Sequence, residues 1–339
     1  MVTKVLKVSN EAVKEASNYI LNGDVVAIPT ETVYGIAGNA YNGDAIKKIF
    51  LAKGRPQDNP LIVHISDMDM LKEVAIDIPK DAYKLASKFW PGPLTMVLKK
   101  SDKVSLVTTA GLDSVGVRMP SDKFAHDLIV NSGVPFAAPS ANISGKPSPT
   151  NANDVYLDMQ GRLPLVVDGG DSLVGVESTV LSLLTGTPVL LRPGYVTKED
   201  IEAVLGKEVI LSGAVIESLK EGETARSPGM KYKHYAPEAE VIIIDANLDK
   251  FTSYVNDKTD DGLYCLVFDG EGDLIIHPTV SYGKTDDAKS QAHNLFTALR
   301  TLDKLGAKKV YARAPLKDGV ALAVYNRLLR AAGFKEIKL

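Results

Sequence analysis

The sequence predicts an α/β protein with a larger N-terminal domain that carries a concave site and a smaller C-terminal domain built on a parallel sheet. Short apolar runs alternate with amphipathic segments along most of the 339 residues, as in repeated strand–helix units. Polar residues follow several of these runs directly, at the strand ends where open α/β sheets bind ligands. From residue 212 to residue 240 the regular apolar pattern lapses, and this change separates the two domains.

The composition is that of an ordinary globular protein. Its hydrophobic fraction is 45% and its charged fraction 24%, and a net charge of -3 provides no global basic field for nucleic acid or membranes. The single Cys265 excludes a disulfide framework and any multi-cysteine metal site. No apolar run approaches ~18 residues and the N-terminus lacks a signal-peptide core, so we expect a cytoplasmic protein without membrane contact.

Helices in the N-terminal domain are indicated by apolar residues three and four positions apart, between a capping residue and a glycine. Over 10–22, for example, Val13, Ala16 and Ile20 share one face and Gly23 ends the helix. Similar patterns predict helices at 44–53, 79–89, 121–131 and 198–205. Short apolar runs bounded by proline, glycine or charge predict strands at 25–28, 61–65, 94–98, 115–120, 135–139, 165–168 and 189–192.

Polar residues from separate segments stand at or just beyond these strand ends, and we expect them to face one hollow. They are Thr30, Thr32, His64, Arg118, Ser140, Asn142, Ser178 and Arg192. Single members have plainer alternatives. A histidine in an apolar strand is also typical of a hydrogen-bonded core residue. An arginine at a strand end either extends along the surface to solvent or binds a carboxylate.

The segment from residue 53 to residue 64 joins a helix to a strand and carries two cations. Gly54 permits a turn, and Pro56 and Pro60 keep the backbone extended. Lys53 and Arg55 are two positions apart, so an extended segment points both side chains the same way. A planar guanidinium beside an ammonium suits a polyphosphate, and the alternative is a solvated basic loop.

The segment from residue 140 to residue 148 carries hydroxyls and an amide, at Ser140, Asn142, Ser144 and Ser148. It invites comparison with the phosphate-binding pattern Gly-x4-Gly-Lys-Ser/Thr. Ser140 replaces the first glycine, however, and Pro147 replaces the hydroxyl residue, so we reject that motif. A turn rich in capping residues and a binding loop both stay open.

Beyond residue 238, alternating strands and helices predict a small parallel sheet. Strands are expected at 241–244, 263–268, 274–276 and 309–312, and helices at 288–305 and 320–332. We place the first domain at 1–212, a linker strap at 213–238 and the C-terminal domain at 239–339. His277 and His293 lie in the last of these without an evident partner and are interpreted as structural.

The linker is unlike a passive spacer, which is usually simpler and richer in Gly, Ser or Pro. Between residues 225 and 237 it has no acidic residue and carries Arg226, Lys231, Tyr232, Lys233, His234 and Tyr235. Basic and aromatic clusters commonly contact nucleotides or RNA. We expect Lys231, His234 and Tyr235 to reach a bound ligand across the mouth of the first domain, with a plain tether as the alternative.

A set of short motifs spans nearly the whole chain in a fixed order. They are Pro29-Thr30-Glu31-Thr32-Val33-Tyr34-Gly35, Lys53-Gly54-Arg55-Pro56, Asn59-Pro60-Leu61, Trp90-Pro91-Gly92-Pro93-Leu94-Thr95, Val117-Arg118-Met119-Pro120, Pro139-Ser140-Ala141-Asn142, Glu177-Ser178-Thr179-Val180, Leu191-Arg192-Pro193-Gly194 and the linker stretch 227–235. Together they resemble the YrdC-type threonylcarbamoyl-AMP synthases in their two-domain form. The resemblance implies a YrdC-like twisted α/β catalytic domain with a concave site, followed by a Rossmann-like α/β domain.

The resemblance also implies a nucleotidyltransferase reaction in which L-threonine, bicarbonate (or CO2) and ATP give threonylcarbamoyl-AMP and pyrophosphate. A partner transferase complex then passes the threonylcarbamoyl group to an adenosine beside the tRNA anticodon, and a weak contact with tRNA belongs to this expectation. Mg²⁺ would arrive with ATP, because no carboxylate pair offers a dedicated cage, so no metal-ligating residue is expected.

Roles for individual residues follow from the same resemblance. Lys53, Arg55 and Arg192 form the expected catalytic group, which would neutralise the triphosphate and the adenylate. The nucleotide is assigned to these three with Asn59, Ser114, Ala138, Ser140, Asn142 and Ser148. Threonine is assigned to Thr32, Tyr34, His64, Arg118 and Ser178, with Arg118 on its carboxylate.

Two other classes fit parts of the pattern. The related domain of hydrogenase-maturation carbamoyltransferases makes a carbamoyl-adenylate, but those proteins carry cysteine-rich zinc modules, which a single cysteine rules out. An RNA-binding module with a concave basic surface is the non-enzymatic alternative. Its clustered cations argue weakly for it, and the net charge of -3 argues weakly against it.

Overall fold

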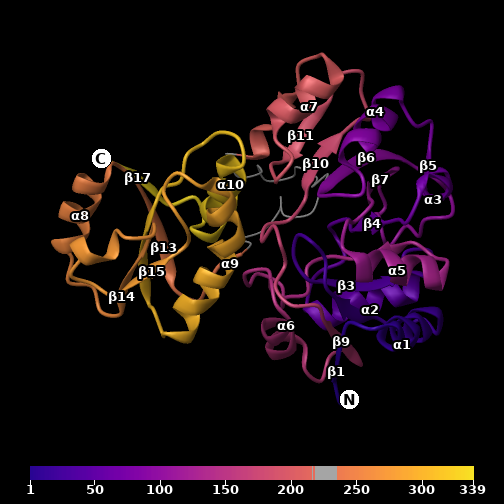
Figure 1. Ribbon diagram of the computed structural model, residues 1–339, viewed down its shortest axis with the longest axis horizontal. Coiled ribbons are helices and arrows are strands. Elements are labelled where there is room, and N and C mark those ends of the chain that lie inside the picture. The colour runs from indigo at the N-terminus through magenta and orange to yellow at the C-terminus, as the bar shows by residue number, and fades with distance from the viewer. Residues whose placement is uncertain (216, 218–234) are drawn as a thin grey trace.

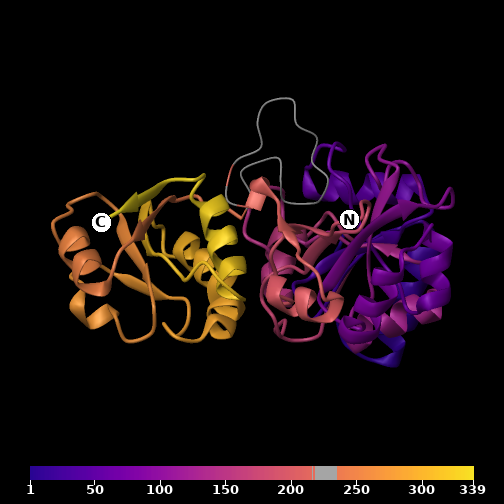
Figure 2. The same ribbon diagram turned by 90° about the horizontal axis from the view of Figure 1, so that it is seen from above.

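The computed structural model describes residues 1–215, 217 and 235–339, which form two α/β domains side by side (Figures 1 and 2). The first domain is built on a 12-stranded sheet. Its strands are β1 (Lys4–Lys7), β2 (Val26–Ile28), β3 (Gly35–Asn39), β4 (Ile62–His64), β5 (Ala75–Ile76), β6 (Leu94–Lys100), β7 (Ser114–Arg118), β8 (Phe136–Ala137), β9 (Leu165–Asp168), β10 (Thr179–Ser182), β11 (Val189–Arg192) and β12 (Ile210–Leu211). Its helices are α1 (Asn10–Leu21), α2 (Gly43–Lys53), α3 (Met68–Val74), α4 (Lys80–Phe89), α5 (Lys123–Ser132), α6 (Ala152–Met159) and α7 (Lys198–Leu205).

Different helices cover the two faces of this sheet. Side chains alternate along a strand, so Val26 and Ile28 of β2 pack on the face that α1 and α5 cover. Ala27 points the other way, into the core that includes Phe50 of α2. Burial on both faces explains why β2 is an unbroken apolar run, as the sequence predicted.

The sheet mixes parallel and antiparallel pairs, in the order β1-β9-β2-β3-β8-β4-β7-β6-β10-β11-β12, with β5 paired to β6. This order places strands from distant parts of the chain next to one another. The parallel pair β4–β7 sets His64 opposite Arg118. The parallel pair β6–β10 sets Leu94 opposite Thr179. The ends of these strands therefore carry polar residues to one edge of the sheet.

The C-terminal domain contains five strands, all parallel, which confirms the predicted parallel sheet. In sheet order they are β15 (Thr279–Ser281), β14 (Leu263–Val267), β16 (Lys309–Arg313), β13 (Glu240–Asp245) and β17 (Glu336–Lys338). Its helices are α8 (Leu248–Asn256), α9 (Ala288–Lys304) and α10 (Ala321–Ala331). Short 3-10 turns occur at Gly213–Val215 and Gly272–Leu274.

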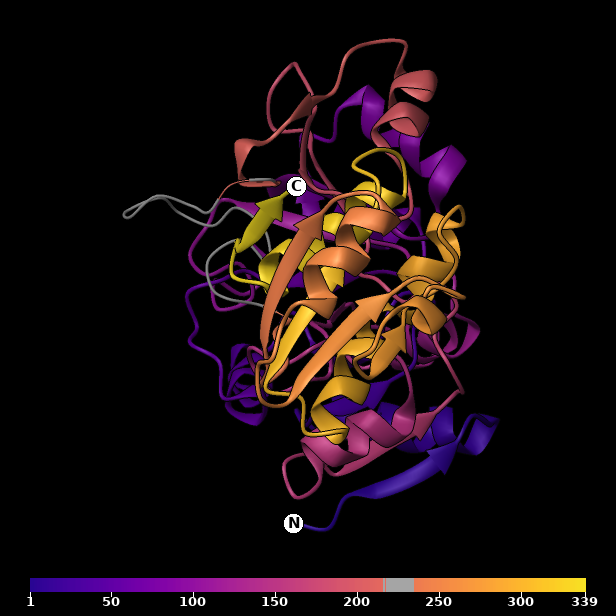
Figure 3. The ribbon, with the colours of Figure 1, turned by 90° about the vertical axis from the view of Figure 1, so that its left-hand side faces the viewer.

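The helices of this domain lie on opposite faces of its sheet. Figure 3, seen from the C-terminal domain, has α8 in front of the strands, whereas α9 and α10 lie behind them, toward the first domain (Figure 1). Along β13, Ile243 packs with the core of α9 and α10, and Ile244 packs with Phe251 of α8. The same period of two governs both domains.

One predicted strand, 274–276, is wrong. Leu274 ends a 3-10 turn, the side chains of Leu274 and Ile276 are 55% and 73% exposed, and the edge strand lies further on, at β15. The apolar run at 274–276 does not show which segment pairs with β14, and the structure pairs Cys265 of β14 with Thr279 of β15.

The sequence also missed β1, β3, β5, β12, β17, α3, α6 and α8. Strand β3 carries two glycines, which are poor strand formers. At Gly38 a Cβ atom would lie 2.9 Å from the side chain of Val25, just before β2, and 3.2 Å from that of Ile49 in α2, so the close approach of these side chains favours glycine there.

The first sheet ends at Leu211 and the second begins at Glu240. The domain limits 1–212, 213–238 and 239–339 stay predictions. Within the described residues, no helix has both the length and the apolar character needed to span a membrane.

Candidate functional site

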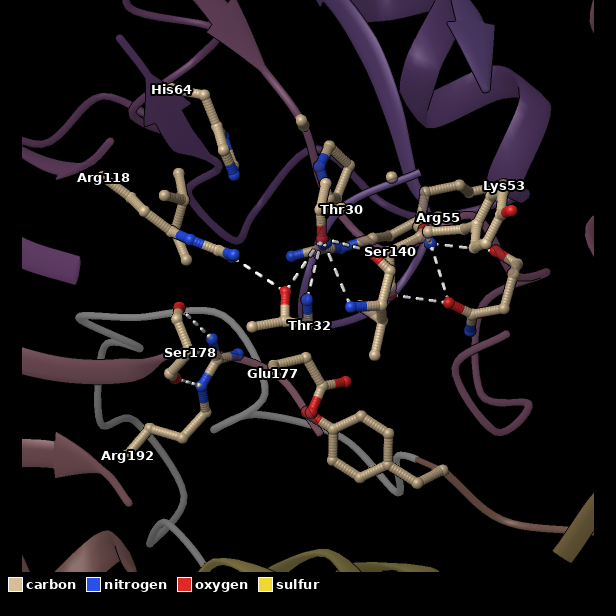
Figure 4. Close-up of a pocket in the computed structure, with 18 of the residues that line it drawn as sticks. Thr30, Thr32, Lys53, Arg55, His64, Arg118, Ser140, Glu177, Ser178 and Arg192 are labelled. Atoms are coloured by element: carbon tan, nitrogen blue, oxygen red, sulfur yellow. Dashed lines mark hydrogen bonds between the residues drawn. The ribbon is translucent and has the colours of Figure 1, made fainter. Parts of the chain in front are cut away.

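A pocket lies at the strand ends of the first domain (Figure 4), with about 740 Å³ of space between the atoms when the adjoining open solvent is included. Many of the predicted site residues line it: Thr30, Thr32, Tyr34, Lys53, Arg55, His64, Arg118, Ala138, Ser140, Asn142, Ser178, Arg192 and Tyr235. The expectation that polar strand ends face one hollow is therefore confirmed. The role of each residue there stays a prediction.

Three predicted nucleotide-binding residues do not line the pocket. Ser114 begins β7, whereas Arg118 ends it, and Ser114 lines a separate, more apolar cavity. Its assignment to the nucleotide stays a prediction, and an extended strand of five residues separates Ser114 from Arg118 by roughly 13 Å. Asn59 is fully buried, and its carbonyl accepts a hydrogen bond from Arg55 Nη2 at 3.2 Å. Ser148 is fully buried beside Glu177, as described below.

Lys53 holds the loop at residues 140–142 in place. It ends α2, where Gly54 caps the helix in a left-handed conformation (φ 61°), and its ammonium turns into the protein. Nζ donates to the carbonyl of Ser140, to the carbonyl of Asn142 at 2.9 Å and to Asn142 Oδ1 at 3.3 Å. Burial lowers the pKa of Lys53 well below its usual range, so an anion bound nearby would favour the charged form.

The loop itself is closed by internal hydrogen bonds. Ser140 Oγ donates to Asn142 Oδ1 at 2.6 Å, and Asn142 Nδ2 donates to the carbonyls of Ile143 and Lys146, both at 2.8 Å. The capping-turn interpretation is therefore right about the local structure. Because Ser140 and Asn142 also line the pocket, the loop can serve as a binding loop as well.

Arg118 and His64 form one side of the pocket, and Lys53, Arg55 and Ser140 form another, with Thr32 between them (Figure 4). Arg118 is buried, and its Nη1 donates to Thr32 Oγ1 at 2.9 Å. Its Nη2 lies 2.7 Å from Glu31 Oε1. Burial opposes ionisation of Glu31, but the ion pair with Arg118 outweighs it and lowers the pKa of that carboxyl. The structure decides between the two alternatives for Arg118: its side chain is buried and bound to a carboxylate, and does not extend to solvent.

His64 is buried and neutral. Burial and the nearby Arg118 lower the pKa of His64 to about 3. Its Nδ1 has no hydrogen-bond partner among the residues that the structure describes. An unsatisfied ring nitrogen that lines a pocket is available to a ligand hydroxyl or ammonium group.

Arg192 and Ser178 form a single unit at the ends of β11 and β10. Arg192 Nε donates to the carbonyl of Ser178 at 3.1 Å, and Nη2 donates to Ser178 Oγ at 3.2 Å. Ser178 Oγ also lies 2.8 Å from Thr95 Oγ1. Ser178, just before β10, is thereby held in place by Arg192 of β11 and Thr95 of β6.

Glu177 lines the pocket and was not assigned a role from the sequence. Its Oε1 accepts from Ser148 Oγ at 2.6 Å, and its Oε2 accepts from Arg327 Nε at 2.8 Å. Although burial opposes it, the charges of Arg327 and Arg192 lower the pKa of Glu177. The signal was present, because Glu177 precedes Ser178 in the quoted motif. Its partner Arg327 comes from the other domain and carried no signal.

Tyr34 and Tyr235 form aromatic parts of the wall. The Tyr34 hydroxyl donates to the carbonyl of Gly170 at 2.6 Å, and burial raises its pKa above the usual range, so it stays protonated. Tyr235, with a left-handed φ of 63°, packs against Phe296 with ring centroids 5.2 Å apart. Tyr235 thus reaches the pocket as expected. Lys231 and His234 lie outside the described residues.

No group of three or more His, Cys, Asp or Glu side chains suited to a metal ion occurs in the described part of the chain. The pocket instead combines cations with hydroxyl and amide groups. Lys53, Arg55 and Arg192 suit phosphate oxygens, whereas Arg118 and His64 suit a carboxylate and a neutral polar group. The arrangement can therefore hold a polyanion beside a small zwitterion.

Comparisons with known proteins agree with this architecture. Residues 18–194 match the Sua5/YciO/YrdC family model, described as telomere recombination, and residues 196–333 match the model for the threonylcarbamoyl-AMP synthase C-terminal domain. The chain is 46% identical to threonylcarbamoyl-AMP synthase of Pyrococcus abyssi, over 96% of each chain. It is 43% identical to that of Bacillus subtilis, over 99% of this chain and 97% of the relative. The solved structure of P. abyssi Sua5 complexed with L-threonine superposes with a TM-score of 0.91 at 42% identity, over 100% of both chains.

Fold and pocket thus define a class, the YrdC-type α/β proteins with a second, parallel α/β domain. Both family models match in order along one chain, and both full-length relatives carry the same name. The chain belongs to the threonylcarbamoyl-AMP synthase family.

Proposed function

We propose that this protein catalyses the formation of threonylcarbamoyl-AMP and pyrophosphate from L-threonine, bicarbonate (or CO2) and ATP. The observation that carries the proposal is one pocket in which Lys53 and Arg55 lie across from Arg118 and His64, with Arg192 beside Ser178 below Arg118 in Figure 4. Full-length relatives named for this activity, and a relative's structure with L-threonine, support the same reading.

The reaction needs two bond-forming steps. The threonine amine attacks the carbon of bicarbonate, and loss of water leaves a carbamate. A carbamate oxygen then attacks the α-phosphorus of ATP. The bond from that phosphorus to its bridging oxygen breaks, pyrophosphate leaves, and a mixed carbamic–phosphoric anhydride remains.

Positioning and charge neutralisation are the main demands of such a displacement. Lys53 and Arg55 would hold the triphosphate, which enters as its Mg²⁺ complex, and Arg192 would face the α-phosphate. Asn142 and Ser140 would hold the nucleotide directly. Ser148 would act through its hydrogen bond to Glu177, and Asn59 through its hydrogen bond with Arg55. No covalent nucleophile is required.

On the amino-acid side, Arg118 would exchange part of its contact with Glu31 and Thr32 for the threonine carboxylate. Neutral His64 and Ser178 would orient the amine and the hydroxyl. Because His64 carries no charge near neutral pH, it does not repel the substrate ammonium group.

The proposal is tested by incubating the protein with ATP, bicarbonate and labelled L-threonine. We expect pyrophosphate release that requires both threonine and bicarbonate, and a labelled anhydride in the product mixture. tRNA binding without such turnover would instead favour the RNA-binding module. A cytoplasmic location and delivery of the product to a tRNA-modifying transferase complex belong to the same proposal.

The linker is proposed to act as a strap in which Lys231, His234 and Tyr235 contact bound ligand. Tyr235 at the pocket supports this. Replacing residues 227–235 with a Gly/Ser stretch of equal length keeps the tether and removes the cations and aromatics. We expect pyrophosphate release to fall at least tenfold, and an unchanged rate would leave only the tether.

A further inference from the structure

A buried arginine of the C-terminal domain contacts the pocket residue Glu177. Arg327 of α10 is 0% exposed. Its Nε donates to Glu177 Oε2 at 2.8 Å, its Nη1 donates to the carbonyl of Pro193 at 2.8 Å, and its Nη2 donates to the carbonyl of Glu177 at 3.1 Å. Each of the three guanidinium nitrogens therefore contacts the first domain.

The acceptors of Arg327 lie next to two pocket residues. Glu177 precedes Ser178 at the start of β10, and Pro193 follows Arg192 at the end of β11. These two segments touch so closely that a Cβ atom on Gly194 would lie 2.3 Å from the Thr179 nitrogen. Arg327 thus binds both segments without lining the pocket, whereas Arg192, which does line it, binds Ser178.

Arg327 also compensates the charge of Glu177. This carboxylate lines a pocket whose other titratable members are mainly cations, and it would repel an anionic ligand if unpaired. Ser148 satisfies one of its oxygens and Arg327 the other. A planar guanidinium can make these contacts in one orientation, which a flexible ammonium cannot reproduce.

We infer that Arg327 is a positioning residue of the active site, through which the C-terminal domain fixes Ser178 and Arg192 and neutralises Glu177. The inference rests on the proposed function for its kinetic readout. Arg327 contacts no substrate in this role. It acts through the two segments that it joins.

Other contacts between the domains provide a matched control. Lys304 of α9 forms an ion pair with Asp154 of α6 at 2.9 Å, and neither residue lines the pocket. Lys304→Ala therefore removes a contact between the domains without touching the segments around Ser178 and Arg192.

The experiment compares full-length Arg327→Met, Arg327→Lys, Lys304→Ala and the double variant Glu177→Gln/Arg327→Met with the native chain. Thermal unfolding comes first, and each assay is run below the transition of the least stable variant. The readouts are kcat and KM for pyrophosphate release, together with Kd values for ATP and for L-threonine by calorimetry.

For Arg327→Met we expect kcat to fall at least tenfold and the Kd values for ATP and L-threonine to rise at least fivefold. For Arg327→Lys we expect at least a threefold loss of kcat, because one ammonium cannot satisfy acceptors on both segments. Lys304→Ala should stay within twofold of native. The double variant should recover ATP affinity, since residue 177 is then neutral. It should not recover kcat, because no arginine joins the segments at residues 177 and 193.

Folded Arg327→Met with kcat and both Kd values within twofold of native would overturn the inference. If Arg327→Met does not fold, Arg327→Lys with native kcat and Kd values would do so. A native chain without threonine- and bicarbonate-dependent turnover would refute the proposed function instead, and the two Kd values of the variants would then decide the role of Arg327.

Discussion

At the scale of single residues, the pocket depends on buried charges that are held by specific partners. Arg118 pairs with Glu31 and Thr32, and Glu177 pairs with Arg327 and Ser148. Removing one partner of a buried pair costs more than removing a surface charge, because the other is left without compensation. Substitutions here should therefore affect both binding and stability, and the two effects have to be measured separately.

Arg118→Ala should raise the KM for L-threonine by roughly 10- to 100-fold, because a hydrogen bond to a charged group is worth about 1.5–3 kcal/mol. The KM for ATP should change less. Steady-state pyrophosphate release gives both values, and Lys123→Ala, at an exposed cation on α5, serves as the control. A large rise for ATP with none for threonine would mean that the two sides of the pocket have been exchanged.

His64 should make native stability sensitive to acid. Its folded pKa of about 3 lies below the ordinary value of 6.5, so the unfolded state binds a proton that the folded state does not. The stability that it contributes is present above pH 6.5 and is lost as the pH falls toward 3. Relative to His64→Gln, the native free energy of unfolding should drop by roughly 2 kcal/mol between pH 7 and pH 5, as denaturant titrations at several pH values would measure. Parallel curves for the two proteins would mean that His64 is accessible to protons in the folded state.

At the scale of elements, the site is made by strand ends that pairing brings together. His64 lies opposite Arg118 because β4 and β7 are parallel neighbours. Ser178 lies beside Thr95 because β6 and β10 are parallel neighbours. Where strand ends meet, backbone can approach backbone only if a side chain is absent, as at Gly194.

Gly194→Ala should destabilise the protein by about 1–3 kcal/mol, because the new Cβ atom would lie 2.3 Å from the Thr179 nitrogen and backbone must move. Since Thr179 follows Ser178, kcat should fall as well. Chemical denaturation and pyrophosphate release measure the two effects. Gly186→Ala is the matched control, since nothing lies within 4 Å of its Cβ position in the turn between β10 and β11. Equal effects of the two substitutions would contradict this explanation.

At the scale of the whole molecule, α9 and α10 lie between the second sheet and the first domain (Figure 1). Arg300 of α9 binds Asp158 at 2.7 Å and the carbonyl of Pro147 at 2.6 Å. His293 Nδ1 lies 3.1 Å from the carbonyl of Leu173. Buried charges and backbone acceptors fix one relative orientation of the domains more sharply than apolar contact alone would.

Gly175→Ala should disrupt this interface. Gly175 has a φ of +83°, and a Cβ atom there would lie 2.4 Å from His293 Cα. Gly170 has a φ of +80° with nothing within 4 Å, so Gly170→Ala has the same backbone strain without the contact. The loss of unfolding free energy should be larger for Gly175→Ala by about 1–3 kcal/mol, as parallel denaturant titrations would measure. Similar losses for both would mean that only backbone strain is involved.

The sequence by itself determined the α/β class, the division into two domains and most of the regular elements, because local periodicity and caps carry that information. It also indicated the polar strand ends, since each follows an apolar run. Only the tertiary structure decided that Ser114, Ser148 and Asn59 do not line the pocket. It also decided that Lys53 binds the loop at 140–142. It alone brought Arg327 to Glu177. Such contacts depend on strand order and domain packing, which join residues far apart in the chain and leave no local pattern.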